Sequence, residues 1–192
     1  MRKTLLLLTT LALAGCNQAA PTAPEKPAAT AAKPGEAPIN TIDRSHAGEP
    51  GPAAVTWEMK GGTKQKLSDH QGMKMLVNLW ATWCAPCVVE MPQLDALAGE
   101  LEGEVRVITI SQDIRAGEVV TPFFAEKGFA RLQPWLDPET QLSAQFSPEG
   151  VLPLTILFDA SGKEVLRVAG GYEWDSPEAI ALIRDAARSR RL

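Results

Sequence analysis

The chain has 192 residues, a formal net charge of −4 and a hydrophobic fraction of 45%. This length and composition are sufficient for one globular domain with a packed core. The acidic balance argues against a nucleic-acid partner, because nucleic-acid-binding surfaces carry an excess of Lys and Arg. With three cysteines and two histidines, the chain also offers few soft ligands for a metal site.

Residues 1–15 have the pattern of an export signal. Arg2 and Lys3 form a short basic region, and the apolar stretch 5–13 is too short for a permanent membrane-spanning helix. The stretch ends in Leu-Ala-Gly-Cys16, which resembles the lipobox of bacterial lipoproteins. That resemblance implies a lipidated Cys16. An ordinary secretory signal and an uncleaved anchor are the alternatives, and all three place the following domain outside the cytoplasm.

Residues 16–38 form an Ala- and Pro-rich segment without any large apolar side chain, so it cannot build a core. We interpret it as an extended tether that reaches at most about 60 Å. The folded domain is predicted to occupy residues 39–192.

The domain should begin with a β-hairpin, in which residues 54–59 and 63–67 flank a Lys-Gly-Gly turn. Residues 74–80 follow as a continuous apolar strand that contains one polar residue, Asn78. Such a strand suits the centre of a sheet covered on both faces.

Directly after this strand comes Trp83-Cys84-Ala85-Pro86-Cys87, at the start of a helix predicted over 84–101. The free N–H groups and the dipole at a helix N-terminus stabilise a thiolate, which is the form that attacks disulfides. The spacing is therefore the signature of a thiol–disulfide oxidoreductase. Half of a zinc site would need two more ligands, and Cys16, His46 and His70 lack the spacing for it. A structural disulfide is the other alternative, but such a short loop adds little stability.

The remaining pattern predicts strands at 105–110, 154–158 and 163–168 and helices at 118–127 and 139–146. Pro92 should kink the first helix, and Ser176 and Pro177 favour the start of a last one. His46 and His70 are expected at surface or loop positions, and Trp57, Trp80, Trp135 and Trp174 as packing groups. The order of elements describes an α/β fold with a mixed β-sheet flanked by helices.

Several motifs in this order resemble the TlpA/ResA-like thioredoxins, over roughly residues 50–187. They are the run Leu76-Val-Asn-Leu-Trp-Ala-Thr-Trp-Cys-Ala-Pro-Cys87, then Glu90-Met-Pro92, Gly150-Val-Leu-Pro153 and Asp159-Ala-Ser-Gly162. The resemblance implies a thioredoxin-like domain with an N-terminal β-hairpin extension. Leu154 departs from the pattern, because relatives commonly carry Thr there.

The resemblance also implies roles for individual residues. Cys84 would be the exposed nucleophile and Cys87 the buried resolving thiol. Trp83, Pro86, Leu152 and Pro153 would contact the substrate, with Pro153 preceded by a cis peptide bond; a trans proline at the start of a strand is the alternative.

Asn78 stands where cytoplasmic thioredoxins carry a buried Asp, and an amide cannot accept the Cys87 proton. Glu90 lies three residues after Cys87 on the same helix face, so a partly buried Glu90 with a raised pKa could accept it. A solvated Glu90 is the alternative. Asn78 itself is expected to be a hydrogen-bonded core residue.

The resulting hypothesis is a lipid-anchored oxidoreductase on the periplasmic side of the bacterial inner membrane, which reduces disulfides in client proteins. The resemblance points to apocytochrome c or to copper-site cysteines of oxidase assembly factors as clients, and to a membrane electron donor. We expect a monomer that needs no metal and no cofactor besides its redox-active disulfide. The alternatives are a disulfide-forming oxidase, a copper-handling module, a peroxidase suggested by Thr82, and a binding-only lipoprotein.

Overall fold

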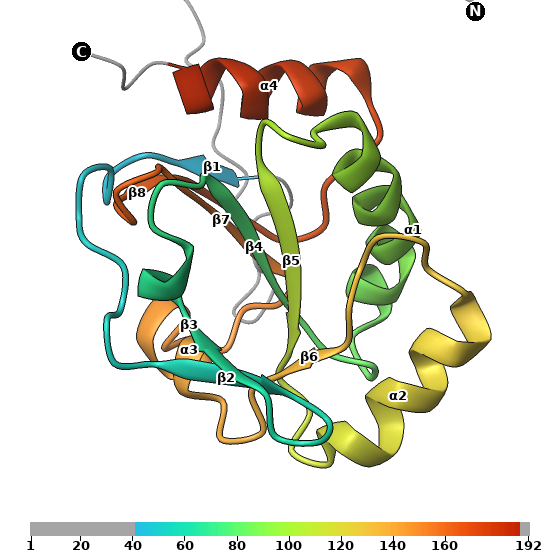
Figure 1. Cartoon of the computed structure of the whole chain (residues 1–192). Helices are drawn as coiled ribbons and strands as arrows, with labels where there is room; N and C mark the ends of the chain where they lie inside the picture. Colours follow the sequence, from blue (N-terminus) through green and yellow to red (C-terminus); the bar gives the residue numbers. More distant parts are fainter. Residues whose placement is uncertain (1–40, 189–192) are drawn as a thin grey trace, which may run out of the picture. The chain divides into compact units, whose positions relative to one another are not determined.

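The computed structural model describes residues 41–188 (Figure 1). The predicted export signal, Cys16 and the tether lie outside the described residues, so those predictions remain open. Within residues 41–188, no helix is both long and apolar enough to cross a membrane.

The described residues form a mixed sheet with strand order β1-β8-β7-β4-β5-β6-β2-β3. Strand β4 lies near its centre, parallel to β5 and antiparallel to β7. The strands are β1 Thr41–Asp43, β2 Thr56–Met59, β3 Lys64–Lys66, β4 Met75–Trp80, β5 Arg106–Ser111, β6 Trp135–Leu136, β7 Leu154–Phe158 and β8 Glu164–Ala169. The predicted hairpin is confirmed as β2 and β3, and it extends the sheet at one edge.

Helices cover both faces of this sheet (Figure 1). They are α1 Ala85–Glu100, α2 Ala116–Lys127, α3 Gln141–Phe146 and α4 Pro177–Arg188, with a 3₁₀ helix η1 at Leu67–His70. Alternate β4 side chains point to opposite faces. Leu76 and Trp80 pack with α1, α2 and α4, whereas Val77 and Leu79 pack with η1 and α3. This double burial explains why β4 is apolar apart from Asn78.

Local signals in the sequence determine where the helices begin and end. Ser176 Oγ accepts a hydrogen bond from the Ala179 N–H at 3.1 Å, and Pro177 is the first residue of α4. Helix α2 ends at Lys127 and is followed by Gly128, whose φ of 65° is left-handed. Helix α1 continues past Pro92 to Glu100.

Two strands were missed by the sequence analysis. Strand β1 has three residues and pairs with β8, and strand β6 has two and pairs with β5. Segments this short carry no recognisable alternation of apolar and polar residues, so only their pairing in the sheet defines them.

The prediction for His70 was wrong. Its ring is 7% exposed and stacks on Trp57, with ring centroids 6.0 Å apart. Its Nε2 and Nδ1 atoms lie 3.1 Å from Gln65 Oε1 and 3.3 Å from a guanidinium nitrogen of Arg106. Burial and the neighbouring Arg106 charge hold the His70 pKa below its ordinary value. The sequence suggested a loop because η1 is only a single turn. The burial of His70 depends on its packing against the β2–β3 hairpin, which the local sequence does not reveal.

Candidate active site

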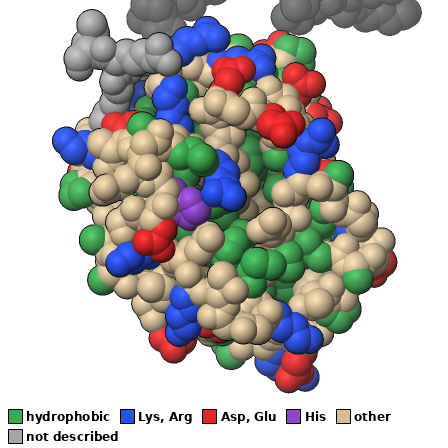
Figure 2. Space-filling view, viewed as in Figure 1, with side chains coloured by type: hydrophobic (Ala, Val, Ile, Leu, Met, Phe, Trp, Pro, Cys, Tyr) green, Lys and Arg blue, Asp and Glu red, His purple; other side chains and the backbone are tan. Residues whose placement is uncertain are grey.

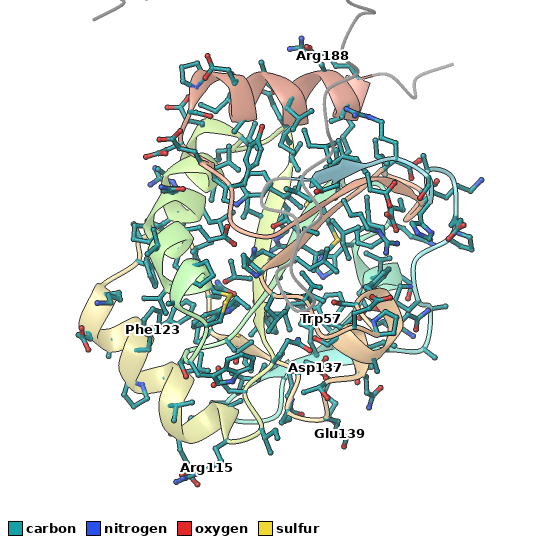
Figure 3. The ribbon with its side chains drawn as sticks, turned by 180° about the vertical axis from the view of Figure 1, so that it is seen from behind. Trp57, Arg115, Phe123, Asp137, Glu139 and Arg188 are labelled. Carbon is teal, nitrogen blue, oxygen red and sulfur yellow. A yellow bond between two sulfur atoms is a disulfide. The ribbon has the colours of Figure 1, made fainter. Side chains whose placement is uncertain are left out.

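Cys84 and Cys87 are joined by a disulfide at the N-terminus of α1, with an S–S distance of 2.07 Å (Figure 3). Cys84 is 6% exposed and Cys87 is fully buried, so Cys84 presents the more accessible sulfur. Cys84 is also the N-cap residue of α1, and its Sγ accepts a hydrogen bond from the Cys87 N–H at 3.4 Å. A thiolate formed at this sulfur would gain from the same N–H and from the helix dipole.

The Leu152–Pro153 peptide bond is cis, as the sequence analysis expected. Pro153 leads into β7, whose first residue, Leu154, pairs with Leu79 of β4. The C-terminal end of β4 leads toward Cys84. The cis-proline loop therefore lies at the same end of the central strands as the disulfide. Leu152 is partly buried and packs against the apolar clusters on both faces of the sheet.

Exposed apolar side chains occur close to the disulfide in the chain. Trp83 precedes Cys84 and is 69% exposed, and Val89 on α1 is exposed to the same extent. Ile114 is 82% exposed, and its neighbour Asp113 is bonded to Thr82. Of these three residues, only Trp83 was predictable from the sequence, because an isolated Val or Ile gives no signal of exposure.

The loop before Cys84 is held by a carboxylate that the sequence analysis missed. Asp113 is 4% exposed and accepts hydrogen bonds from the Thr82 N–H at 2.9 Å and the Thr82 hydroxyl at 2.7 Å. It also accepts from the Ser111 hydroxyl at 2.8 Å. Thr82 therefore serves in the structure as an anchor for this loop.

Glu90 lies on the buried side of α1, where its side chain is 2% exposed. Its Oε1 accepts from Asn78 Nδ2 at 2.7 Å, and its Oε2 accepts from the Tyr172 N–H at 3.2 Å and from Trp174 Nε1 at 3.0 Å. Burial raises the pKa of Glu90 to about 7, although the three hydrogen bonds oppose that rise by stabilising the ionised form. The alternative of a solvated glutamate is thus wrong. A carboxyl with this pKa can take up and release a proton near neutral pH.

Asn78 is a fully buried, hydrogen-bonded residue of β4, as predicted. Its Nδ2 donates both to Glu90 and to Thr155 Oγ1, at 2.7 and 2.9 Å. Trp174 was expected to be only a packing group. It is fully buried, but its indole also bonds Glu90, a contact that joins residues 84 positions apart and that no local pattern could reveal.

Comparison with known proteins is consistent with this geometry. A family model described as Redoxin matches residues 46–181. The chain belongs to this family. Within it, the chain is of the TlpA/ResA-like thioredoxin type.

The curated relatives include a thiol-disulfide oxidoreductase ResA of Bacillus cereus. It is 29% identical over 128 residues, which cover 67% of this chain and 72% of the relative. ResA of Geobacillus kaustophilus is also 29% identical, over 65% of this chain and 69% of the relative. The chain is accordingly a thiol–disulfide oxidoreductase with Cys84–Cys87 as its redox disulfide.

Solved structures with under 25% identity support the fold. A putative thiol:disulfide interchange protein DsbE from Chlorobium tepidum has a TM-score of 0.60 at 22% identity, covering 73% of this chain and 94% of that one. The exposed lipoprotein thioredoxin Etrx1 of Streptococcus pneumoniae has a TM-score of 0.57 at 23% identity, covering 69% and 96%. Both confirm the thioredoxin-like arrangement of sheet and helices.

The structure brings most of the predicted site residues to one region. Pro86 and Glu90 lie on α1, which begins at the two cysteines. Gly171 lies beside Pro86, since a Cβ at position 171 would be 3.5 Å from Pro86 Cβ. Leu152 and Pro153 lie at the same end of the central strands as the disulfide, and Trp83 is in the loop between β4 and α1. Cys16 lies outside the described residues.

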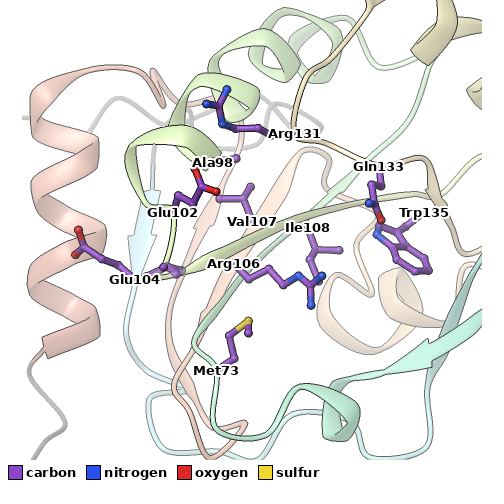
Figure 4. A pocket seen from close by; sticks show the side chains of 12 residues that line it. Met73, Ala98, Glu102, Glu104, Arg106, Val107, Ile108, Arg131, Gln133 and Trp135 are labelled. Atoms are coloured by element: carbon purple, nitrogen blue, oxygen red, sulfur yellow. The ribbon is translucent and has the colours of Figure 1, made fainter.

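A separate hollow of about 340 Å³ lies near the C-terminal end of α1, the end away from the disulfide (Figure 4). It is lined by Met73, Ala98, Val107, Arg131 and Trp135, among others. Figure 2 shows hydrophobic side chains gathered in a recess on the face of the molecule seen in Figure 1. Since α1 has 16 residues, its two ends are separated by about 24 Å, and none of the predicted site residues lines this hollow.

Proposed function

We propose that the chain reduces disulfides in extracytoplasmic client proteins through Cys84 and Cys87. The observation that carries this proposal is the disulfide at the N-terminus of α1, with its more exposed sulfur on Cys84 and the buried Glu90 on the same helix. The names of the curated relatives support the same chemistry.

The reaction starts from the reduced pair and transfers two electrons to the client. The Cys84 thiolate attacks one sulfur of the client disulfide, so that a mixed disulfide forms and one client thiolate leaves. Cys87 then loses its proton and attacks Cys84 Sγ, which releases the second client thiolate. The client ends reduced, and the chain ends in the oxidised form that the structure shows.

Glu90 would accept the proton that Cys87 loses. It follows Cys87 by three positions on α1, so the two side chains share a helix face. Its pKa of about 7 allows it to be ionised when it receives the proton. Trp83, Pro86, Leu152 and Pro153 would contact the client around Cys84.

The export pattern supports a location on the periplasmic side of the bacterial inner membrane, with lipidated Cys16 as the anchor and residues 16–38 as the tether. A protein in this compartment meets no reducing buffer, so a membrane-bound thiol–disulfide donor would re-reduce the pair. The family resemblance favours apocytochrome c or copper-site cysteines as clients. The chain would act as a monomer, with its dithiol as the only redox group.

The reduction potential tests the direction of this reaction. The chain would carry Cys16→Ser, so that Cys84 and Cys87 are its only thiols, and would be equilibrated in graded thiol buffers before alkylation. We expect a potential of about −180 mV or lower, which suits a reductase. A potential of about −120 mV, as for a strong periplasmic oxidant, would contradict reduction and favour disulfide formation by the same residues.

A further inference from the structure

The Glu90 carboxylate is surrounded by hydrogen-bond donors. Asn78 Nδ2 faces Oε1, and the Tyr172 N–H and Trp174 Nε1 face Oε2. An N–H group can only donate, so this arrangement matches an ionised carboxylate. Once protonated, the carboxyl carries an O–H that needs an acceptor, because a buried donor without a partner is destabilising.

The acceptor is already next to Glu90. Asn78 Oδ1 is buried and has no hydrogen-bond partner among residues 41–188. The oxygen and nitrogen of an amide are attached to the same carbon. A half turn about the Cβ–Cγ bond therefore moves Oδ1 to the place of Nδ2, 2.7 Å from Glu90 Oε1.

Thr155 is compatible with both orientations of this amide. In the structure its Oγ1 accepts from Asn78 Nδ2 at 2.9 Å, and after a half turn its hydroxyl can donate to Oδ1 instead. Thr155 is held in place because it pairs with Asn78 across β7 and β4. In the observed orientation Asn78 Oδ1 has no partner among residues 41–188, and Thr155 can pair with the amide in either orientation, so the protonation state of Glu90 decides between them.

The other carboxylate oxygen is occupied in both states. Tyr172 N–H and Trp174 Nε1 both bond Oε2, and neither group can accept a hydrogen bond in return. The proton is therefore directed to Oε1, the oxygen that faces Asn78.

We propose that Asn78 is a positioning residue whose side-chain amide turns over when Glu90 Oε1 takes up a proton. With Glu90 ionised, Asn78 Nδ2 donates to Oε1; with Glu90 protonated, the O–H donates to Asn78 Oδ1. The step moves one proton from the Cys87 sulfur to Glu90 Oε1 and transfers no electrons. It rests on the proposed role of Glu90 as proton acceptor.

Few other groups can titrate near this carboxyl. Burial and the three hydrogen bonds account for the shifted Glu90 pKa, with no charged side chain of the described residues among its causes. The chain segments that contact Glu90 also carry Cys84 and Cys87 on α1, and Tyr172, Glu173 and Asp175 beside Trp174; the ring centroid of Tyr172 lies 4.9 Å from that of Trp174. In the oxidised protein the two cysteines do not titrate.

Nuclear magnetic resonance on the oxidised, isotope-labelled chain tests the amide turnover. The Glu90 carboxyl carbon shift reports its protonation between about pH 5 and 9. The coupling across the hydrogen bond from Asn78 Nδ2 to the Glu90 carboxyl carbon reports the amide orientation. We expect the coupling to be present above the Glu90 midpoint and lost below it, with the Asn78 side-chain shifts following the same midpoint.

Glu90→Gln is the matched control, because its amide N–H₂ replaces the carboxyl O–H as a permanent donor toward Asn78. In this variant the Asn78 side-chain shifts should stay near the low-pH values of the unsubstituted chain at every pH. Shifts near the high-pH values would overturn the turnover.

Two further outcomes separate this inference from the proposed function. If Glu90 titrates while the coupling and the Asn78 shifts stay constant, the amide does not turn, and the role of Glu90 is untouched. If Glu90 stays in one protonation state across the range, its role as proton acceptor is wrong, and the inference about Asn78 fails with it.

Discussion

Trp174 Nε1 donates a hydrogen bond to Glu90 Oε2 over 3.0 Å, and both side chains are buried. The contact ties the segment between β8 and α4 to the middle of α1. It is reinforced by the Trp174 N–H, which donates to Gln93 Oε1 at 3.1 Å. The carboxyl that follows the redox cysteines is therefore positioned by a part of the chain that is remote in sequence.

Substitution of Trp174 by Phe should raise the Glu90 pKa further, because the ionised carboxylate loses a donor while its burial remains. A hydrogen bond to a charged group contributes about 1.5–3 kcal/mol, so we expect an upward pKa shift of roughly one to two units. The Glu90 carboxyl carbon shift, followed against pH, measures it.

Trp80→Phe provides the matched control for this substitution. Trp80 is also fully buried, but its Nε1 has no hydrogen-bond partner within residues 41–188. It should lose packing without moving the Glu90 midpoint. Equal shifts in the two variants would mean that the Trp174 indole is not the cause.

Glu90→Gln should remove a pH dependence of stability. The Glu90 pKa is raised from 4.5 to about 7 by folding, so between these values the folded chain binds more protons than the unfolded chain. The stability from this group is fully present below pH 4.5 and is lost as the pH rises through 7, by on the order of 3 kcal/mol.

Urea unfolding of the oxidised chain at about pH 5 and pH 8 measures this effect. The free energy of unfolding of Glu90→Gln should exceed that of the unsubstituted chain at the higher pH, and the difference should shrink at the lower one. A difference that is the same at both pH values would contradict a raised Glu90 pKa.

The two single-cysteine variants should differ in how much mixed disulfide they form. Cys87→Ser retains the more accessible sulfur, so it should accumulate a mixed disulfide with a client or a model disulfide. Cys84→Ser should form little, because Cys87 is fully buried. Mass spectrometry after acid quenching detects the adducts. Similar trapping by both variants would show that the buried thiol is also reachable.

Asp113→Asn should loosen the loop that precedes Cys84. The amide cannot accept all three hydrogen bonds from Thr82 and Ser111 that the carboxylate accepts. We expect a loss of roughly 2 kcal/mol in unfolding free energy, with slower reduction of the client. Thr82→Val keeps the bond from its backbone N–H, so its loss should be smaller. An unchanged Asp113→Asn variant would show that this carboxylate does not hold the loop.

Much of the fold was predictable because β4, β5, β7 and the helix α1 have strong local signals. Mainly apolar runs of five or six residues predict buried strands, and Cys84 and Pro86 lie where a helix begins. The redox pair was predictable for the same reason, since its chemistry depends on a spacing of three positions. Strands β1 and β6, the burial of His70 and the role of Trp174 were not, because each depends on partners far along the chain.

Short stretches of sequence were enough to establish the dithiol, its place at a helix N-terminus and the resemblance to a family, because these features are local. They also indicated Glu90, but with a solvated carboxyl as the alternative. The choice between the two came from the packed fold. Burial of Glu90 raises its pKa to about 7 against the opposing hydrogen bonds from Asn78, Tyr172 and Trp174, and desolvation of a carboxyl exists only once the strands and helices have packed around it.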